Sequence, residues 1–143
     1  MRLARHEVAI HAPIEVVWAH LTTAEGLMRW VGPAASAEAV PGGALRWTHP
    51  DGSTVVGRFV ELNPPHRLVF TYGWDGDLMG VPPESTTVEI TLSETAGSTT
   101  LSLEHHGLAP AVADAHEQGW AYFLAVLSDV LAGRPPPTAA RGY

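Results

Sequence analysis

One long amphipathic helix, expected from Ala111 to Leu131, constrains the fold of this chain more than any other feature. A step of about 100° per residue gathers the apolar side chains in one broad sector, as in a helix packed on a sheet. That sector holds Val112, His116, Gly119, Trp120, Phe123, Val126, Leu127, Val130 and Leu131, and opposite it lie Asp114, Glu117, Gln118, Ser128 and Asp129. His116 and Gly119 interrupt the apolar face near its middle, which indicates a pocket as well as a core.

Length and charge exclude several classes of protein. The 143 residues fit one domain, which at about 150 residues buries roughly 68–70% of its unfolded surface. Eight Lys and Arg against fifteen Asp and Glu give a net charge of −7, so we expect no nucleic-acid partner. The chain has no cysteine, which excludes disulfides and thiolate metal sites. Residues 1–21 contain no uninterrupted apolar run, so we expect no membrane insertion and a cytoplasmic location.

Short elements precede the long helix. Arg5–His11 is expected to form a strand, Pro13 to begin a short helix, and Thr22 to cap a second one that runs to Trp30. Turn residues then separate alternating segments, so successive strands pair as antiparallel neighbours. The expected strands are Ala35–Val40, Ala44–His49, Thr54–Leu62, Arg67–Trp74, Ser85–Ser93 and Ser98–His106.

These elements predict an α+β helix-grip architecture. A curved antiparallel sheet of about six to seven strands wraps around one long C-terminal helix, with two short helices after the first strand. Residues 1–133 form a single domain in this interpretation, and the Pro-rich residues 134–143 form a flexible tail.

Strand alternation predicts which side chains face the helix. The strand Thr54–Leu62 is ambiguous because both of its faces carry apolar residues, and Gly57 suggests a bulge there. Four side chains are expected to point to solvent: Glu89, Ser102, Glu104 and His106. The expected inner residues are Leu45, Trp47, His49, Leu68, Phe70, Tyr72, Trp74, Val88, Ile90, Leu92, Leu101, Leu103 and His105.

A subset of the inward-facing residues forms the candidate ligand-binding site. Aromatic walls with a few polar groups are typical of small-molecule sites, although the same residues also suit a filled core. Gly119 costs about 1 kcal/mol relative to alanine in a helix, so either the helix approaches the sheet closely there or space is left for a ligand. The candidates are Trp47, Phe70, Tyr72, Trp74, Leu103, His105, His116, Gly119, Trp120 and Phe123.

Two histidines are candidates for catalysis. His105 and His116 both face the predicted pocket and suit general acid–base chemistry near neutral pH. The alternative is that each is a buried histidine bonded to a backbone carbonyl or to Tyr72. A metal site built from His105, His106 and His116 with Glu104 is disfavoured. His105 and His106 point to opposite faces, and His116 lacks a second ligand four residues on. We therefore expect no metal and no cofactor.

The loop from Gly76 to Pro83 has two interpretations. Its glycines and apolar residues suit a lid over the pocket. The alternative, which we favour, is an ordinary hairpin loop whose Leu78 and Met79 tuck against the sheet edge.

Five segments carry a resemblance to a known superfamily: Ile10–Trp18, Leu27–Trp30, Pro41–Gly43, Gly57–Thr71 and His116–Trp120. On these the chain resembles the START-like helix-grip (SRPBCC) domains, and within them the bacterial homologues of the activator of heat-shock-protein-ninety ATPase. The resemblance implies a cavity between sheet and helix, which the superfamily uses for lipids, sterols, plant hormones and polyketides. It also implies a chaperone-associated role, which we discount because the eukaryotic activity needs an additional N-terminal domain.

The expected function is therefore binding of a small, largely hydrophobic molecule of lipid, sterol, polyketide or aromatic type. A cyclase, dehydratase or hydrolase that uses His105 or His116 is the first alternative. A protein-interaction module is the second. A homodimer is left open.

Overall fold

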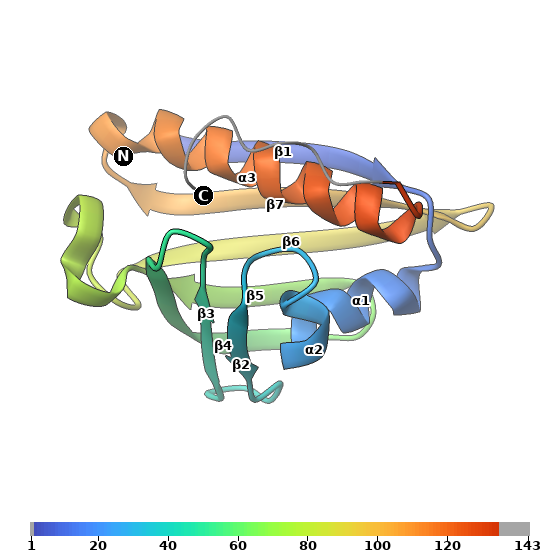
Figure 1. Cartoon of the computed structure of the whole chain (residues 1–143), viewed down its shortest axis with the longest axis horizontal. Helices are drawn as coiled ribbons and strands as arrows, with labels where there is room; N and C mark the ends of the chain where they lie inside the picture. Colours follow the sequence, from blue (N-terminus) through green and yellow to red (C-terminus); the bar gives the residue numbers. More distant parts are fainter. Residues whose placement is uncertain (1, 135–143) are drawn as a thin grey trace.

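The computed structural model describes residues 2–134, and it confirms the predicted α+β helix-grip architecture (Figure 1). Apart from Arg134, the predicted tail lies outside the described residues. In chain order the elements are β1 (Arg2–Ile10), α1 (Ile14–Thr22), α2 (Ala24–Leu27), β2 (Ala34–Ala37), β3 (Ala44–Thr48), β4 (Thr54–Asn63), β5 (Arg67–Tyr72), η1 (Asp75–Gly80), β6 (Thr86–Thr95), β7 (Ser98–Leu108) and α3 (Pro110–Leu131).

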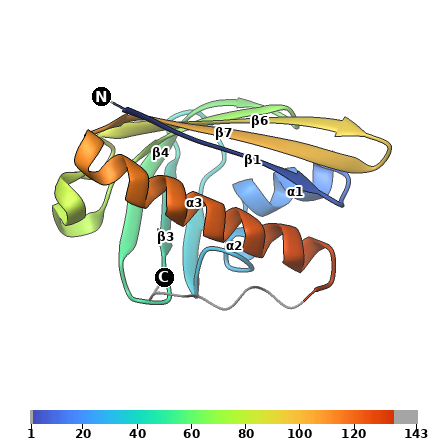
Figure 2. The ribbon, with the colours of Figure 1, turned by 90° about the horizontal axis from the view of Figure 1, so that it is seen from above.

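The strands form one seven-stranded sheet in the order β1-β7-β6-β5-β4-β3-β2, and every neighbouring pair is antiparallel. Figure 2 shows the three α-helices on the same side of this curved sheet. The residues predicted to face that side are buried, from Leu45 and Trp47 on β3 to Leu103 and His105 on β7. In the part of the chain that the structure describes, no helix is both long enough and apolar enough to cross a membrane.

Helix α3 covers the β1 edge of the sheet as well as its inner face. The free backbone N–H of Arg5 donates to Glu117 Oε1 at 3.0 Å, which satisfies an edge group that no strand pairs. Because α3 packs in this corner, its buried sector is wider than the sequence predicts. The expectation that Ser128 faces solvent is therefore wrong: it is buried, and its hydroxyl lies 3.5 Å from Ala9 O.

Several boundaries differ from the prediction. The cap of α2 is Thr23, whose Oγ1 accepts from Gly26 N at 3.0 Å, whereas Thr22 Oγ1 donates back to Trp18 O. Helix α2 ends at Leu27, short of the expected end at residue 30. Strand β2 ends at residue 37 instead of 40, because the chain turns back there through hydrogen bonds within residues 38–44. Strand β5 ends at residue 72, two residues before its predicted end.

The structure resolves the ambiguity in β4. Val55 and Phe59 are buried on the inner face, and exposed Arg58 pairs with Glu84 at 3.1 Å. The predicted bulge at Gly57 is wrong, because the register shift lies between residues 59 and 61. Gly57 is instead required by close packing, since an added Cβ would lie 1.8 Å from the carbonyl oxygen of Thr71.

Replacing Gly57 with alanine should lower the free energy of unfolding by about 2 kcal/mol, because β4 and β5 must separate to admit the methyl group. Gly42→Ala is the matched control: Gly42 has φ +84° and open space around its Cβ position, so only backbone strain of about 1 kcal/mol is expected. Urea unfolding followed by circular dichroism measures both changes. Equal losses in the two variants would contradict the packing explanation.

Candidate functional site

A small, mostly apolar cavity lies between the inner face of the sheet and the first half of α3. Its volume is about 50 Å³. The loop after α2 and the segment η1 complete its walls. The lining residues are Val31, Trp47, His49, Tyr72, Trp74, Met79, Ala115, His116, Gly119, Trp120 and Phe123.

Most of the predicted site residues line this cavity, but three do not. Phe70 instead lines a second hollow of about 10 Å³, whose walls share Trp47 and Trp120 with the first. Leu103 and His105 are fully buried in the core between β7 and α3 and do not line the cavity.

Sequence reasoning missed four lining residues. His49 was assigned to the inner face, and its position beside Trp47 could have placed it in the site. Ala115 lies one helical turn before Gly119, so helical spacing could also have found it. Val31 and Met79 lie in connecting segments, where no periodic pattern indicates the direction of a side chain.

The rings around the cavity pack closely against one another. The Trp47 ring makes edge contacts with Tyr72 and Trp120, with centroids 6.1 Å and 6.4 Å apart. His49 stacks on Phe123 at 4.5 Å with an interplanar angle of 20°. Aromatic pairs of this kind add about 0.5–1.5 kcal/mol beyond area burial, so each ring contact contributes modestly to the stability of the cavity wall.

Three tryptophan–histidine pairs satisfy the polar atoms of this aromatic region. In each pair the indole N–H donates to a histidine ring nitrogen, so that nitrogen must carry no proton. The pairs are Trp47 with His49 at 3.3 Å, Trp74 with His116 at 3.0 Å, and Trp120 with His105 at 3.1 Å.

The second nitrogen of each histidine is also occupied. Nδ1 of His49 lies 2.9 Å from Val31 O, and Nδ1 of His116 lies 2.8 Å from Val112 O. A carbonyl oxygen only accepts, so Nδ1 is the protonated nitrogen in both rings. His116 therefore matches the predicted alternative of a histidine bonded to a backbone carbonyl.

His105 adopts the other tautomer. The Thr86 hydroxyl donates its proton to Tyr72 O at 2.7 Å, so His105 Nε2, 2.8 Å away, donates to the Thr86 oxygen. The Tyr72 ring packs edge-on against His105 at 4.4 Å. Thr86 and Trp120, rather than a carbonyl, satisfy the ring nitrogens of His105.

Burial keeps these histidines neutral. Desolvation, together with the nearby His116 and His106, lowers the pKa of His105 to about 3. Desolvation also lowers the pKa of His49 and of His116, against the opposing effect of their hydrogen bonds to backbone carbonyls. The structure brings the His105 and His116 rings within 5.6 Å of each other. All four of their ring nitrogens are engaged, so proton transfer to a substrate would first require breaking a hydrogen bond.

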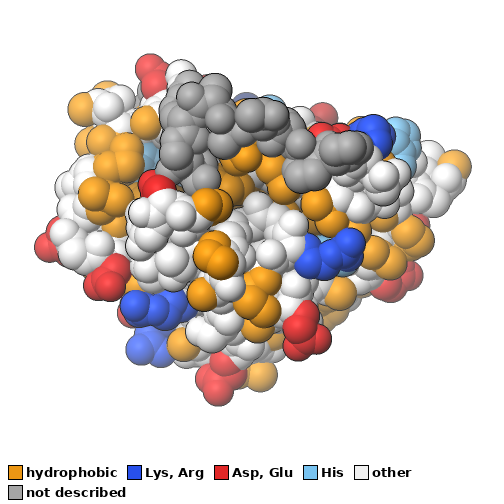
Figure 3. Space-filling model, viewed as in Figure 1, with side chains coloured by type: hydrophobic (Ala, Val, Ile, Leu, Met, Phe, Trp, Pro, Cys, Tyr) orange, Lys and Arg blue, Asp and Glu red, His pale blue; other side chains and the backbone are white. Residues whose placement is uncertain are grey.

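The segment η1 lies at the mouth of the cavity. Leu78 and Met79 are 46% and 41% exposed, so the expectation that they tuck against the sheet edge is wrong, although η1 does connect the antiparallel neighbours β5 and β6. Positive φ angles at Gly76, Asp77 and Met79 interrupt the helical path of this segment. Figure 1 shows η1 projecting at one end of the molecule, and Figure 3 shows hydrophobic side chains at the surface of that end.

Comparisons with known proteins agree with this architecture. Residues 11–132 match the family model for Activator of Hsp90 ATPase homolog 1-like protein. No curated protein shows significant similarity to the chain. An AHSA1-like protein from Rhizobium etli is 39% identical, with a TM-score of 0.70, over 98% of this chain and 89% of the other.

Two further solved structures extend the comparison. The Aha1 dimer from Colwellia psychrerythraea is 25% identical, with a TM-score of 0.73, over 92% of this chain and 96% of the other. DynU16, a protein of the dynemicin biosynthetic locus, is 27% identical, with a TM-score of 0.79, over 95% of this chain. The chain spans 49% of the length of DynU16. The family match and the sheet wrapped around α3 lead to one conclusion: the chain belongs to the Activator of Hsp90 ATPase homolog 1-like family, within the SRPBCC helix-grip superfamily.

Proposed function

We propose that this protein binds a small, largely hydrophobic molecule of aromatic type in the cavity between the sheet and α3. The observation that carries the proposal is the lining itself, which consists of aromatic rings, neutral histidines and small or apolar side chains, with no Asp, Glu, Lys or Arg among the described residues that form it. Apolar burial at about 25 cal/mol per Å² would supply most of the affinity. The similarity to DynU16 supports a small-molecule ligand, because that protein belongs to a biosynthetic locus.

The cavity must enlarge to take such a ligand. Its volume of about 50 Å³ is far below the roughly 300–1,000 Å³ of typical ligand pockets. Two features allow expansion: Met79 lines the mouth from the exposed segment η1, and the rings of Trp47 and Trp120 separate the cavity from the second hollow. In this proposal η1 moves as a lid and the two rings shift to join the hollows.

The engaged histidines favour binding over the enzyme alternative. A general acid or base needs a ring nitrogen within reach of the substrate, and both nitrogens of His105 and of His116 already have partners. We therefore assign His116 to the cavity wall and His105 to the support of Trp120.

Native mass spectrometry of the protein purified from its own host tests the proposal directly. We expect a reproducible excess over the 15.2 kDa of the chain, lost on denaturation. The same spectra report the oligomeric state, for which we propose a homodimer by analogy with the dimeric relative from Colwellia psychrerythraea. A mass equal to that of the monomer would contradict the homodimer. A mass without excess would favour the protein-interaction alternative over ligand binding.

Filling the cavity should abolish ligand binding. The neutral fluorophore N-phenyl-1-naphthylamine serves as the probe, and its binding should quench tryptophan emission because three tryptophans line the cavity. Gly119→Leu places a side chain in this space and also removes a glycine from a helix, so we expect roughly tenfold or greater loss of probe affinity.

Ala111→Leu is the matched control, because Ala111 is exposed in the first turn of the same helix and does not line the cavity. Its probe affinity should equal that of the unmodified protein. Equal affinities in all three proteins would place the probe elsewhere and overturn the assignment of the site.

A further inference from the structure

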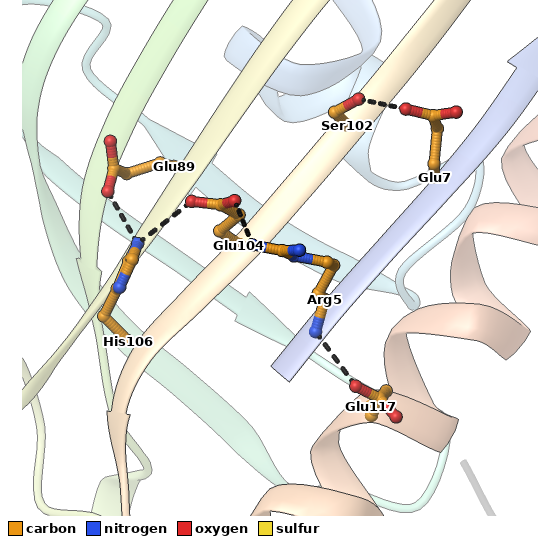
Figure 4. Close-up of polar contacts among 7 residues, drawn as sticks. All are labelled: Arg5, Glu7, Glu89, Ser102, Glu104, His106 and Glu117. Atoms are coloured by element: carbon orange, nitrogen blue, oxygen red, sulfur yellow. Dashed lines mark hydrogen bonds and ion pairs between the residues drawn. The ribbon is translucent and has the colours of Figure 1, made fainter. Parts of the chain in front are cut away.

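The outer face of the sheet, away from α3, carries a second group of functional side chains. Glu89 on β6 lies directly opposite Glu104 on β7, and His106 follows two residues after Glu104. Residues two apart on a strand share a face, so the three side chains project together (Figure 4). We refer to Glu89, Glu104 and His106 as the outer-face cluster.

Two arginines orient the carboxylates of the outer-face cluster. Arg67 holds Oε1 of Glu89 at 2.5 Å, and Arg5 holds Oε2 of Glu104 at 3.0 Å. Each carboxylate therefore turns its other oxygen toward Nε2 of His106, at 2.6 Å for Glu89 and 3.5 Å for Glu104. Nε2 of His106 and one oxygen of each carboxylate therefore lie close together. The other oxygen of each carboxylate is bound by an arginine, which fixes the orientation of the carboxylate.

The nitrogen of His106 at the centre of this group lacks a hydrogen bond. Among the described residues, Nε2 of His106 stands out as a buried side-chain atom that has no hydrogen-bond partner of acceptable geometry. This is so although Oε2 of Glu89 lies 2.6 Å away. That oxygen is close to the nitrogen but off the direction of its N–H or lone pair. Nε2 and the two carboxylate oxygens therefore lie close together without a well-directed hydrogen bond between them, and a cation shared by the three atoms would satisfy them.

The charge around the outer-face cluster also suits a cation. Arg67 also pairs with Glu61, whose Oε2 lies 3.1 Å from its Nε. The positive charges of Arg5 and Arg67 therefore do not fully balance the negative charges of Glu61, Glu89 and Glu104. Glu7 lies farther along the same face, bonded to Ser102 (Figure 4). The chain as a whole carries a net charge of −7.

From this geometry we infer that Glu89, Glu104 and His106 bind one divalent transition-metal ion of the Zn²⁺ type. Their ligand atoms all lie within 4.8 Å of one another. One imidazole and two carboxylates form a donor set that Zn²⁺ accepts. The side chains are 28–40% exposed, which leaves the remaining coordination positions to water.

The expectation of no metal site already considered His106 and Glu104, but together with His105 and His116. It rested on strand alternation, which sends His105 and His106 to opposite faces, and the structure confirms that His105 is buried while His106 lies on the outer face. Glu89 joins the outer-face cluster only through the register of β6 with β7. The site is separated from the cavity by the sheet, so it is independent of the proposed ligand binding.

Isothermal titration of the tag-free, chelator-treated full chain with Zn²⁺ tests the inference. We expect one ion per chain, and binding roughly tenfold or more weaker in His106→Ala and in Glu89→Gln. His11→Ala is the matched control, because His11 is an exposed histidine bonded to Ser98, outside the cluster. Its affinity should be unchanged.

Nuclear magnetic resonance of the unmodified protein provides a readout that does not depend on the variants folding. Zn²⁺ should shift the imidazole ¹⁵N signal of His106 and saturate at one equivalent. Absence of binding, binding unaltered by His106→Ala, or saturation without a shift at His106 would each overturn the inference.

Discussion

Replacing Trp120 with alanine should lower the free energy of unfolding by about 3–5 kcal/mol, a larger loss than we expect from Gly57→Ala. Trp120 is only 6% exposed, and its ring contacts those of Trp47, Tyr72 and His105. Its removal also leaves Nδ1 of His105 without its donor in a buried site. Because Trp120 lines both hollows, the alanine variant joins them into one larger cavity.

Trp120→Phe separates the two contributions to this loss. Phenylalanine keeps an aromatic ring in the wall but removes the indole N–H, so we expect a loss of about 1–3 kcal/mol from the unpaired His105 nitrogen and the smaller ring. Guanidinium unfolding followed by far-ultraviolet circular dichroism measures both variants. A loss in Trp120→Ala no greater than that in Trp120→Phe would show that the ring contributes little to packing.

Acidification from pH 7 to pH 5 should destabilise the protein through its buried histidines. The pKa of His105 is about 3 in the folded protein, against 6.5 for an ordinary histidine. Between these values the unfolded chain binds the proton and the folded protein does not, so stability is present above pH 6.5 and decreases as the pH falls toward 3. At pH 5 His105 alone accounts for about 2 kcal/mol. His49 and His116 act in the same direction, because burial lowers the pKa of each.

Urea unfolding at pH 7 and pH 5 measures this dependence. Two carboxyl groups do not contribute over that range. Desolvation acts to raise the pKa of Asp51, but the Ser53 hydrogen bonds and the nearby His49 outweigh it and lower that pKa; Arg67 lowers the pKa of Glu89, so both groups stay ionised. His105→Gln provides the control, since it removes a buried histidine with a pKa of about 3 and should flatten the dependence. Equal stability of the unmodified protein at the two pH values would contradict the neutral state assigned to these histidines.

Local patterns in the sequence were sufficient to predict the helices and strands and the face to which most side chains point. The period of the segment 111–131 predicted α3, and alternation correctly placed Trp47, Leu103 and His105 inside and His106 outside. These features depend on backbone geometry that repeats every few residues, so each can be read from its own segment.

Other features depend on how distant segments meet, and only the tertiary structure decided them. The burial of Ser128 follows from the edge of β1, and the need for glycine at position 57 follows from a carbonyl on β5. Likewise, the tautomer of His105 follows from Thr86 and Trp120, which lie on two other elements. The volume of the cavity and the convergence of the outer-face cluster arise in the same way. Register and interatomic distance are set by packing between elements, and no periodicity within one segment encodes them.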